Sequence, residues 1–514
     1  MTLTATETSA NGLRDGYNVV WEPLKGSQTL ALTCPCNHIL YEGTRGPGKT
    51  DAQLMAFRKN VGKGYGAYWR GVIFDREYKN LDDLIAKSKR WFNAFDDGAK
   101  WHGAGKDLKW TWPTGEELLF RSIKSPDDYW NYHGQEFPFI GWNELTKYPS
   151  PDLYEAMMSC NRSSFLPHRH APLRKDGTRE PVPEIPLVVF STTNPYGAGH
   201  NWVKMRFIDP AKPGQVVKMT SEVFNPRTQQ RETITKTQVR IFGSYKENIY
   251  LSPEYVLELE SISDPNKRKA WLYGDWDVVA GGAFDDLWNS DIHIVPRFKI
   301  PKGWYVDRSF DWGSTHPFSV GWWAESNGED VTLEDGTVFN VPAGSLIRIH
   351  EWYGAETLGL NKGLKMSPSA VARGIVQRES ELLAEGWIQK LPYAGPADGQ
   401  IYGKPRTDQE SIAEVMQDLE VHWEKADKSP GSRINGLQLV RDRLERSANY
   451  EGSGLYFMRH CAAALATLPV LPRDTNNPDD VDTEAEDHVY DDVRYRCLAA
   501  APRDAENLNV HLPT

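Results

Sequence analysis

The stretch "YEGTRGPGKTDAQL", residues 41–54, decides the fold of the first half of the chain. Gly43, four further residues and "GKT" at 48–50 match the pattern G-x-x-x-x-G-K-[ST] in full. The apolar run "HILYEG" at 38–43 predicts a strand before the loop, and a helix is expected from about Lys49. A glycine-rich turn between a strand and a helix offers backbone N–H groups and the positive end of a helix dipole to an anion. The stretch therefore predicts a phosphate-binding loop, or P-loop, in an α/β domain.

Candidate contacts with a nucleoside triphosphate follow from the positions in this loop. Lys49 is expected to reach the β- and γ-phosphates, and Thr50 is expected to hold Mg²⁺ through its hydroxyl group. Arg45, Gly46 and Gly48 belong to the same loop and complete its predicted nucleotide-binding residues. Because the pattern is specific for triphosphate binding, a nucleoside triphosphate and Mg²⁺ are the predicted cofactors.

An apolar strand that ends in polar residues should complete the nucleotide site. "FPFIGWNEL" at 137–145 provides it, and places Glu144 where a carboxylate can orient and polarise the attacking water. The preceding residue is Asn143, where such sites usually carry a Mg²⁺-binding aspartate. An amide carbonyl can still accept from a metal-bound water, but it brings no charge. We expect Asn143→Asp to be tolerated. A solvated strand end is the alternative interpretation of Glu144.

A third strand end, "FSTTNP" at 190–195, carries hydroxyl and amide groups. If it lies beside the P-loop, Thr193 and Asn194 are placed to sense the γ-phosphate and to transmit its loss. Polar strand ends are common, so an ordinary solvated loop is the alternative.

The length of 514 residues is too great for one ordinary core and predicts at least two domains. Apolar runs and helical patterns alternate in residues 1–263, which is typical of a mostly parallel sheet covered by helices. Residues 264–302 are expected to form a linker or hinge, and residues 303–514 a second domain.

In the second domain, three sequential strands precede alternating helices and strands, which resembles the ribonuclease-H-like order. The expected elements are strands 303–311, 317–324, 345–353 and 387–394, and helices 368–386, 408–426, 433–447 and one from His488. The predicted fold class is therefore α/β, with a P-loop ATPase domain followed by a ribonuclease-H-like domain.

Acidic residues fall where a ribonuclease-H-like sheet collects metal ligands. "WYVDRSFDWG" at 304–313 places Asp307 and Asp311 on one face of a strand, and Asp398 follows a glycine-proline turn. "EDHVYDDVRY" at 486–495 adds Asp491 on the last helix. Carboxylates from separate elements repel one another unless cations lie between them, and a pair of Mg²⁺ or Mn²⁺ ions about 4 Å apart is the usual solution.

Three of these acids are the predicted metal-binding and catalytic residues of phosphodiester cleavage: Asp311, Asp398 and Asp491. Asp487 and His488 are alternatives for the third place. Asp307 has a structural alternative, in which it pairs with a basic neighbour such as Arg308 or Arg348. A solvated charge is the alternative for any single aspartate.

The composition excludes several classes of protein. A net charge of −11 argues against a basic coat for static binding to nucleic acid, but it leaves room for a local basic groove. No apolar run approaches the ~20 residues that span a bilayer, so no membrane association is expected. The polar start "MTLTATETSANGLRDG" lacks the apolar core of a signal peptide. Few, scattered cysteines fit a reducing compartment, and "CPC" at 34–36 predicts thiols rather than half of a zinc site.

The chain resembles the large terminase subunit of tailed bacteriophages over roughly residues 20 to 500. The resemblance depends on the order of six motifs: "GTRGPGKT", "FIGWNEL", "STTNP", "SFDWG", "PADG" and "DHVYDDVRY". It implies an ATPase that drives double-stranded viral DNA into a procapsid and a metal-dependent endonuclease that cuts concatemeric DNA. The implied partners are the portal protein, the small terminase subunit and further copies of the chain in a ring. The implied location is the host cytoplasm during virion assembly, not the mature virion.

The resemblance also assigns roles to residues. Glu144 falls on the catalytic carboxylate of the family, and Thr192, Thr193 and Asn194 fall on its coupling motif. Gln28, upstream of the P-loop, resembles the glutamine that reads adenine. Three arginines are candidates for the arginine finger, and the sequence does not distinguish between them: Arg45, Arg121 and Arg162. A surface salt bridge is the alternative role for each.

Two other functions are compatible with the sequence. A nucleic-acid helicase or remodelling ATPase keeps the P-loop but has no nuclease activity. An ATP-gated assembly scaffold binds ATP with negligible turnover, and the neutral Asn143 is the feature that favours it.

Overall fold

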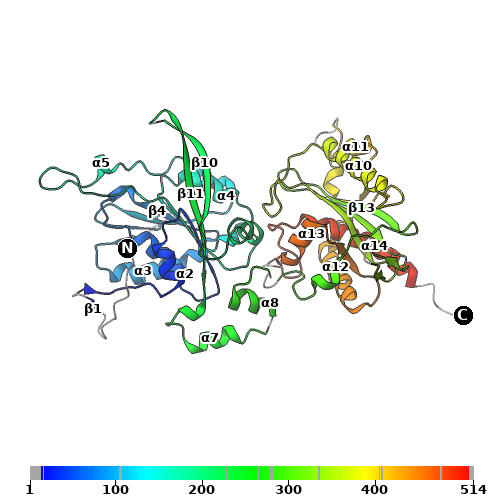
Figure 1. Cartoon of the computed structure of the whole chain (residues 1–514), viewed down its shortest axis with the longest axis horizontal. Coiled ribbons are helices and arrows are strands. Elements are labelled where there is room, and N and C mark those ends of the chain that lie inside the picture. The colour runs from blue at the N-terminus through cyan, green and yellow to red at the C-terminus, as the bar shows by residue number, and fades with distance from the viewer. Residues whose placement is uncertain are drawn as a thin grey trace. The chain divides into compact units, whose positions relative to one another are not determined.

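The computed structural model describes residues 13–14, 17–103, 107–226, 228–263, 265–277, 282–333, 336–404, 406, 409–474 and 477–508. The chain divides into two compact units, Met1–Trp276 and Asp277–Thr514 (Figure 1). Residue 264 and residues 278–281 of the expected linker, and most of the polar N-terminal stretch, lie outside the described residues. Among the helices that are described, none combines the length and the apolar character needed to span a bilayer.

The first unit is built on a nine-stranded sheet with the strand order β10-β11-β3-β9-β8-β4-β7-β6-β5. Its strands from β11 to β7 run parallel, and the pairs β10–β11, β6–β7 and β5–β6 are antiparallel. The bounds are β3 (His38–Gly43), β4 (Arg70–Asp75), β5 (Lys100–His102), β6 (Lys109–Thr111), β7 (Glu117–Ser122), β8 (Phe139–Trp142), β9 (Val188–Thr192), β10 (Val217–Asn225) and β11 (Gln230–Gly243). The mostly parallel α/β sheet predicted for this part of the chain is confirmed.

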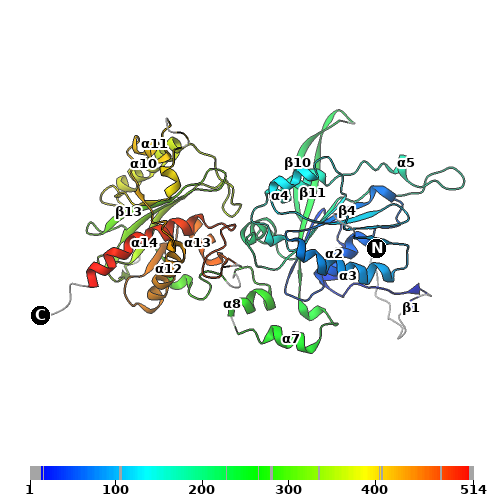
Figure 2. The same ribbon diagram turned by 180° about the vertical axis from the view of Figure 1, so that it is seen from behind.

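Helices flank this sheet, and Figures 1 and 2 show α2 and α3 side by side next to it. The helices of the unit are α1 (Ser27–Thr33), α2 (Lys49–Arg58), α3 (Leu81–Ala94), α4 (Asp152–Met157), α5 (Pro167–His170), α6 (His200–Val203), α7 (Pro253–Glu260) and α8 (Pro265–Arg268). A small hairpin of β1 (Leu13–Arg14) and β2 (Tyr17–Asn18) precedes them. Buried Phe57 of α2 stacks on buried Trp69 and meets the edge of Phe139, so aromatic packing joins the helix to the sheet.

The start of the P-loop is a point of close backbone approach. Gly43 ends β3 opposite Gly243 of β11, and it has a φ of +118°. A Cβ atom on Gly43 would overlap the carbonyl oxygen of Gly243. Glycine is therefore required here both by the backbone conformation and by the neighbouring strand.

The second unit is built on a seven-stranded sheet with the order β12-β20-β17-β14-β13-β18-β19. Strands β13, β14 and β17 are successive antiparallel neighbours, and β18 and β19 are added in parallel beyond β13. The bounds are β12 (Ile294–Val295), β13 (Tyr305–Asp311), β14 (Ser319–Glu325), β17 (Leu346–Tyr353), β18 (Pro396–Ala397), β19 (Glu424–Lys425) and β20 (Leu455–Met458), with a separate pair β15 (Val331–Thr332) and β16 (Val338–Phe339). Three antiparallel strands followed by two parallel ones give the ribonuclease-H-like order predicted from the sequence.

Both faces of this second sheet carry helices. Figures 1 and 2 show α10 and α11 on one side of β13, and α12 and α14 on the other. The bounds are α9 (Ser290–His293), α10 (Pro368–Ala384), α11 (Ile412–Gln417), α12 (Ser432–Asn449), α13 (Ala462–Thr467) and α14 (His488–Leu508). Ser367 caps α10 by accepting from the backbone N–H of Ala370, with Pro368 as the first helical residue, so the sequence "SPSA" fixes this start.

Two predicted elements of the second unit are wrong. Residues 387–394 form no strand, because Pro392 cannot donate to a ladder and only Tyr393 makes an isolated bridge, to Asp307. The strand that precedes Asp398 is the shorter β18. The helix expected over 408–426 is limited to α11, because the chain turns at Glu420, with φ of 63°, and then pairs as β19 with β18.

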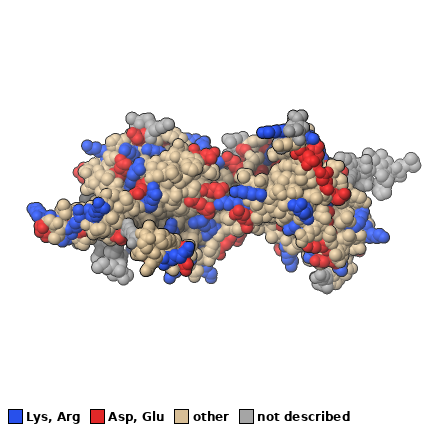
Figure 3. All heavy atoms as spheres, turned by 90° about the horizontal axis from the view of Figure 1, so that it is seen from above, with Lys and Arg blue, Asp and Glu red and all other residues tan. Residues whose placement is uncertain are grey.

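The many tryptophans serve mainly for packing. The largest fully buried side chains include Trp69, Trp110, Trp142, Trp202, Trp304, Trp322 and Trp323. The five cysteines are free, and four of them are buried. On the face drawn in Figure 3, basic and acidic side chains are interspersed over both units, in keeping with the modest net charge.

Candidate functional site

The P-loop lines a cavity of about 680 Å³ in the first unit. The loop connects β3 to α2, and Gly46 and Gly48 adopt φ of +94° and +82°, which glycine accepts without strain. The lining includes the predicted nucleotide-binding residues Arg45, Gly46, Gly48, Lys49 and Thr50, and also Lys87, Glu144, Lys147, Asn194, Asn248, Tyr255 and Trp271. The structure therefore brings three separate sequence motifs to one cavity.

Lys49 lines this cavity and is buried. Its ammonium group donates to the carbonyl oxygen of Thr44 at 2.6 Å and to Oδ1 of Asn194 at 2.8 Å. Burial lowers the pKa of Lys49 to about 8, against the opposing effect of the Glu144 and Glu42 carboxylates. A buried ammonium with so few partners is a strong binding group for an anion.

Glu144 is linked to Lys49 through one amide. The Nδ2 atom of Asn194 donates to the two carboxylate oxygens of Glu144 at 3.4 and 3.3 Å, while its Oδ1 accepts from Lys49. Asn194 follows β9 and Glu144 follows β8, and these two strands are parallel neighbours in the sheet. Asn194 is thus positioned to register a change at either charged group.

The two threonines of the predicted coupling motif contact the turn that follows β8. Thr192 accepts at Oγ1 from the backbone N–H of Glu144 at 3.3 Å. Thr193 shares a 2.7 Å hydrogen bond between hydroxyl groups with Thr146, and both side chains are buried. The strand end at 190–195 therefore lies against the turn that carries Glu144, as required for a sensor of the nucleotide.

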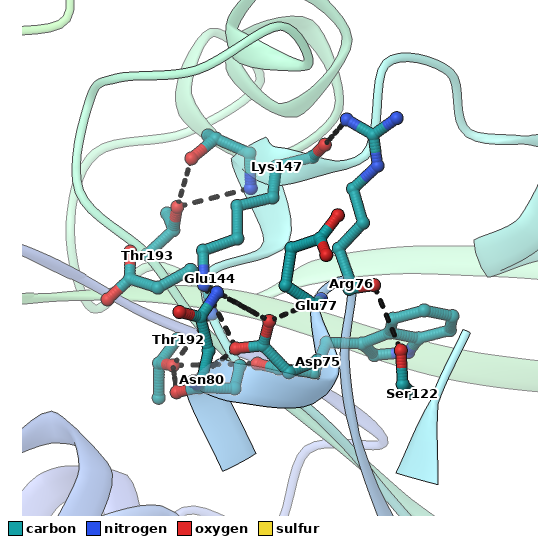
Figure 4. Close-up of polar contacts among 12 residues, drawn as sticks. Asp75, Arg76, Glu77, Asn80, Ser122, Glu144, Lys147, Thr192 and Thr193 are labelled. Atoms are coloured by element: carbon teal, nitrogen blue, oxygen red, sulfur yellow. Dashed lines mark hydrogen bonds and ion pairs between the residues drawn. The ribbon is translucent and has the colours of Figure 1, made fainter. Parts of the chain in front are cut away.

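Asp75 is a residue of this site that the sequence analysis missed. It ends β4, it is fully buried, and Figure 4 shows it among Lys147, Asn80 and Glu77. Its carboxylate accepts from Nδ2 of Asn143 at 2.7 Å and from Nζ of Lys147 at 2.9 Å. The signal in the sequence was an acid directly after the apolar strand "YWRGVIF", but its partner strand is not apparent without the sheet order.

Gln28 lies behind the P-loop rather than in the cavity lining. Its Nε2 donates to the carbonyl oxygen of Gly48 at 2.9 Å, and its Oε1 accepts from the backbone N–H of Leu24 at 2.6 Å. The side chain is buried, and both ends of its amide are occupied by backbone groups. These contacts brace the loop, and the predicted contact with adenine stays a prediction.

Of the three candidate arginine fingers, Arg45 lines the cavity, where its guanidinium group lies 3.3 Å from the ring centroid of Trp271. Arg121 donates to the carbonyl oxygens of Leu108 and Phe120, and Arg162 donates to that of Gly134.

The predicted nuclease residues converge in the second unit. Asp311 ends β13, Asp398 follows β18, and Asp491 lies on α14. Burial raises the pKa of Asp311 well above its ordinary value, and the nearby charges of Asp491 and Asp398 raise it further. The alternatives lie here as well: His488 Nδ1 is 3.3 Å from Asp311 Oδ2, and burial together with the charge of Asp491 raises the pKa of Asp487.

Cationic side chains balance these acids in this structure. Lys428 forms an ion pair with Asp398, and Nη2 of Arg494 lies 2.9 Å from Oδ1 of Asp491. Within the part of the chain that the structure describes, no three or more His, Cys, Asp or Glu side chains are arranged to hold a metal ion. The carboxylate oxygens suit Mg²⁺ or Mn²⁺ in chemical type, but their present arrangement does not form a metal site.

Two neighbouring acids are structural. Asp307 pairs with Nε of Arg496 at 2.8 Å, a basic partner on α14 that was not among the residues named from the sequence. Asp492 is fully buried and accepts from Arg348 at 3.0 Å and from Ser309 at 2.9 Å. The sequence gives no sign of these pairings, because the partners lie more than 140 residues apart.

The fold and the two sites define a chain with a P-loop ATPase-like unit followed by a ribonuclease-H-like unit. No protein-family profile and no curated protein matches it. The large terminase of a thermophilic bacteriophage, solved in complex with ADP, shares 16% identity over 92% of this chain and 98% of its own, with a TM-score of 0.37. The HK97 bacteriophage large terminase shares 11% identity over 91% of this chain and 93% of its own, with a TM-score of 0.39. The P22 large terminase nuclease domain shares 14% identity over 43% of this chain and 93% of its own, with a TM-score of 0.29.

All three are large terminases or a domain of one, the family that the motifs resemble.

Proposed function

We propose that this chain is the motor and nuclease subunit of a viral DNA-packaging machine, in which ATP hydrolysis moves double-stranded DNA into a procapsid. The observation that carries the proposal is the hydrogen-bonded series Lys49–Asn194–Glu144 at the wall of the P-loop cavity. It joins a phosphate-binding cation to a candidate catalytic carboxylate through a residue of a third strand.

In the proposed reaction, Lys49 and the backbone N–H groups of the P-loop bind the β- and γ-phosphates. Glu144 orients the attacking water and accepts its proton. Thr50 would hold Mg²⁺, which neutralises phosphate charge when bound. A γ-phosphate that attracts Lys49 weakens its hydrogen bond to Asn194, and the contacts of Thr192 and Thr193 pass that change to the turn after β8.

The second unit would cut the DNA. Asp311, Asp398 and Asp491, with Asp487 or His488 as an alternative for the third place, would hold the divalent ions that supply an activated water. For this to occur, Lys428 and Arg494 must give up their present carboxylate partners.

Movement of one unit against the other through residues 264–302 would couple hydrolysis to translocation, within a ring of several copies docked on a portal. A small terminase subunit would select the DNA, and the work would be done in the host cytoplasm during assembly. Contacts with the DNA backbone should make binding sensitive to salt and indifferent to sequence.

The test uses the full chain. Steady phosphate release that is lost in both Lys49→Ala and Glu144→Ala supports the proposal, and a further rise with empty procapsids and linear DNA supports the packaging role. Cleavage of plasmid DNA with Mn²⁺ that disappears in Asp311→Ala, but persists in a variant of the exposed Asp418, supports the nuclease. Release that is equal in the wild type and both P-loop site variants would overturn the ATPase.

One observation favours a second candidate. Because the described residues form no ready metal site, a translocating ATPase without nuclease activity fits the second unit as it stands. Intact plasmid at every Mn²⁺ concentration, together with DNA-stimulated ATP turnover, would select this alternative.

A further inference from the structure

The neutral Asn143 has an explanation in the neighbouring strand. We propose that Asp75 is a positioning residue for ATP hydrolysis, and that the pair Asp75–Asn143 replaces the single acid usually found at position 143. The inference rests on the proposed ATPase function of this site. Beyond that function, it assigns to Asp75 the role of fixing the turn that carries Glu144.

Sheet register places the two side chains together. Phe74 of β4 pairs with Trp142 of β8, and the backbone N–H of Asn143 continues this ladder by donating to the carbonyl oxygen of Phe74 at 2.8 Å. The next residue of β4 is Asp75, so its carboxylate meets the Asn143 amide directly, at 2.7 Å. The contact is therefore fixed by two paired strands and not by a mobile surface chain.

The carboxylate of Asp75 is fully satisfied. Besides Asn143 it accepts from Nζ of Lys147 at 2.9 Å, from the backbone N–H of Glu77 at 3.0 Å and from Nδ2 of Asn80 at 3.2 Å (Figure 4). A buried carboxylate is tolerated only with such partners, and removing its charge leaves Lys147 without its buried counter-ion.

Residue 143 must donate a hydrogen bond in this arrangement. The Nδ2 atom of Asn143 donates to Asp75, and its Oδ1 accepts from the hydroxyl group of Thr192 at 3.4 Å. An aspartate at 143 would place two carboxylates at hydrogen-bonding distance with no proton between them. From the sequence alone we expected Asn143→Asp to be tolerated. With this arrangement we expect instead that the substitution impairs ATP hydrolysis.

Asp75 holds both ends of the turn that carries Glu144. It binds Asn143 before Glu144 and Lys147 after it, and the neighbouring Arg76 donates to the carbonyl oxygen of Lys147 at 3.0 Å (Figure 4). Glu144 itself has a φ of 54°, a left-handed conformation that a residue with a side chain keeps only when its surroundings impose it. Without Asp75 the Glu144 carboxylate should lose its fixed place in the cavity.

A charge exchange tests this inference in the full chain. Asp75→Asn and Asn143→Asp should each lower kcat for ATP by about tenfold or more with little change in KM, and the double variant Asp75→Asn/Asn143→Asp should recover most of the loss. Each single variant should also lower the melting temperature, and the double variant should restore it. Asp82→Asn, which removes an exposed carboxylate of α3, is the matched control and should change neither quantity.

The outcomes separate this inference from the proposed function. Asn143→Asp with wild-type turnover, or a double variant that recovers neither turnover nor melting temperature, overturns the role of Asp75. Absence of turnover in the wild type overturns the ATPase instead. In that case the recovery of the melting temperature still decides whether residues 75 and 143 form a charge-matched pair.

Discussion

At the P-loop, one lysine and one glutamate share a single asparagine and face a cavity of about 680 Å³. At the end of β13, by contrast, several carboxylates crowd together and are balanced by Lys428 and Arg494. The first site is arranged to receive an anion with little rearrangement. The second gathers several acids, and in this structure the side chains of Lys428 and Arg494 pair with two of them. The comparison indicates that two sites of one chain can differ in how far their side chains are arranged before a ligand binds.

The largest effect is expected at the preorganised site. Lys49→Ala should lower ATP turnover by about two to three orders of magnitude, because it removes the buried cation that faces the phosphates. Phosphate release under steady-state conditions measures this loss, and Lys63→Ala on the exposed surface is the control. Near-normal turnover in Lys49→Ala would show that this site is not the one that hydrolyses ATP.

At the crowded site, Asp311→Asn should have two opposite effects. Plasmid cleavage should fall by about a hundredfold or more, because a candidate metal ligand is lost. In EDTA at neutral pH the melting temperature should rise, because the pKa of Asp311 is raised in the folded chain and its ionised form disfavours folding. That cost is absent at acidic pH and grows as the pH rises above the ordinary value near 3.8. A fall in melting temperature at neutral pH would contradict our account of the crowded carboxylates.

The pH dependence of nucleotide binding depends on the protonation of Lys49. Since burial lowers the pKa of Lys49 to about 8, nucleotide should bind the charged form and affinity should fall by about tenfold per pH unit above that value. Binding should take up a proton in the same range. Calorimetric titrations from pH 7 to pH 9.5 measure both effects. Lys49→Arg keeps its charge and should flatten the profile, so a profile equally steep in this variant would exclude Lys49 as the titrating group.

The smallest effect is expected from Lys428→Ala. This ammonium group is partly exposed, so its ion pair with Asp398 contributes little to stability. Its loss should nevertheless strengthen stabilisation by Mn²⁺. The rise in melting temperature on addition of Mn²⁺ should be a few degrees larger in the variant than in the wild type. Lys425→Ala, an exposed neighbour, is the control. An unchanged response would mean that Lys428 does not compete with a divalent ion.

Much of the fold could be predicted because local patterns determined it. The strand at 38–43 and the helix from Lys49 follow from apolar periodicity and glycine placement, and both are present as β3 and α2. The motifs around Glu144 and Asn194 were also found locally, and their meeting at one cavity follows from the parallel neighbours β8 and β9.

The features that escaped prediction depend on pairings between distant strands. Asp75 is an ordinary strand end until β4 is known to lie beside β8. Arg496, which donates to Asp307, lies on a helix 189 residues later in the chain. The extended arm of β10 and β11 has no marked apolar alternation to announce it, since most of its side chains are exposed. The strand expected over 387–394 failed because Pro392 outweighed its apolar content.

The contact between Gly43 and Gly243 bears on how loss-of-function variants of this chain should be interpreted. Gly43 is the first residue of the phosphate-binding pattern. The place where a Cβ atom of residue 43 would lie is nevertheless occupied by the backbone of β11 and is not part of the cavity. An alanine at this position would force two core strands apart before any ligand arrives. An inactive Gly43 variant would therefore indicate a disrupted sheet. A genetic screen that treats every position of the motif as equivalent would wrongly interpret this loss of activity as a loss of nucleotide contacts.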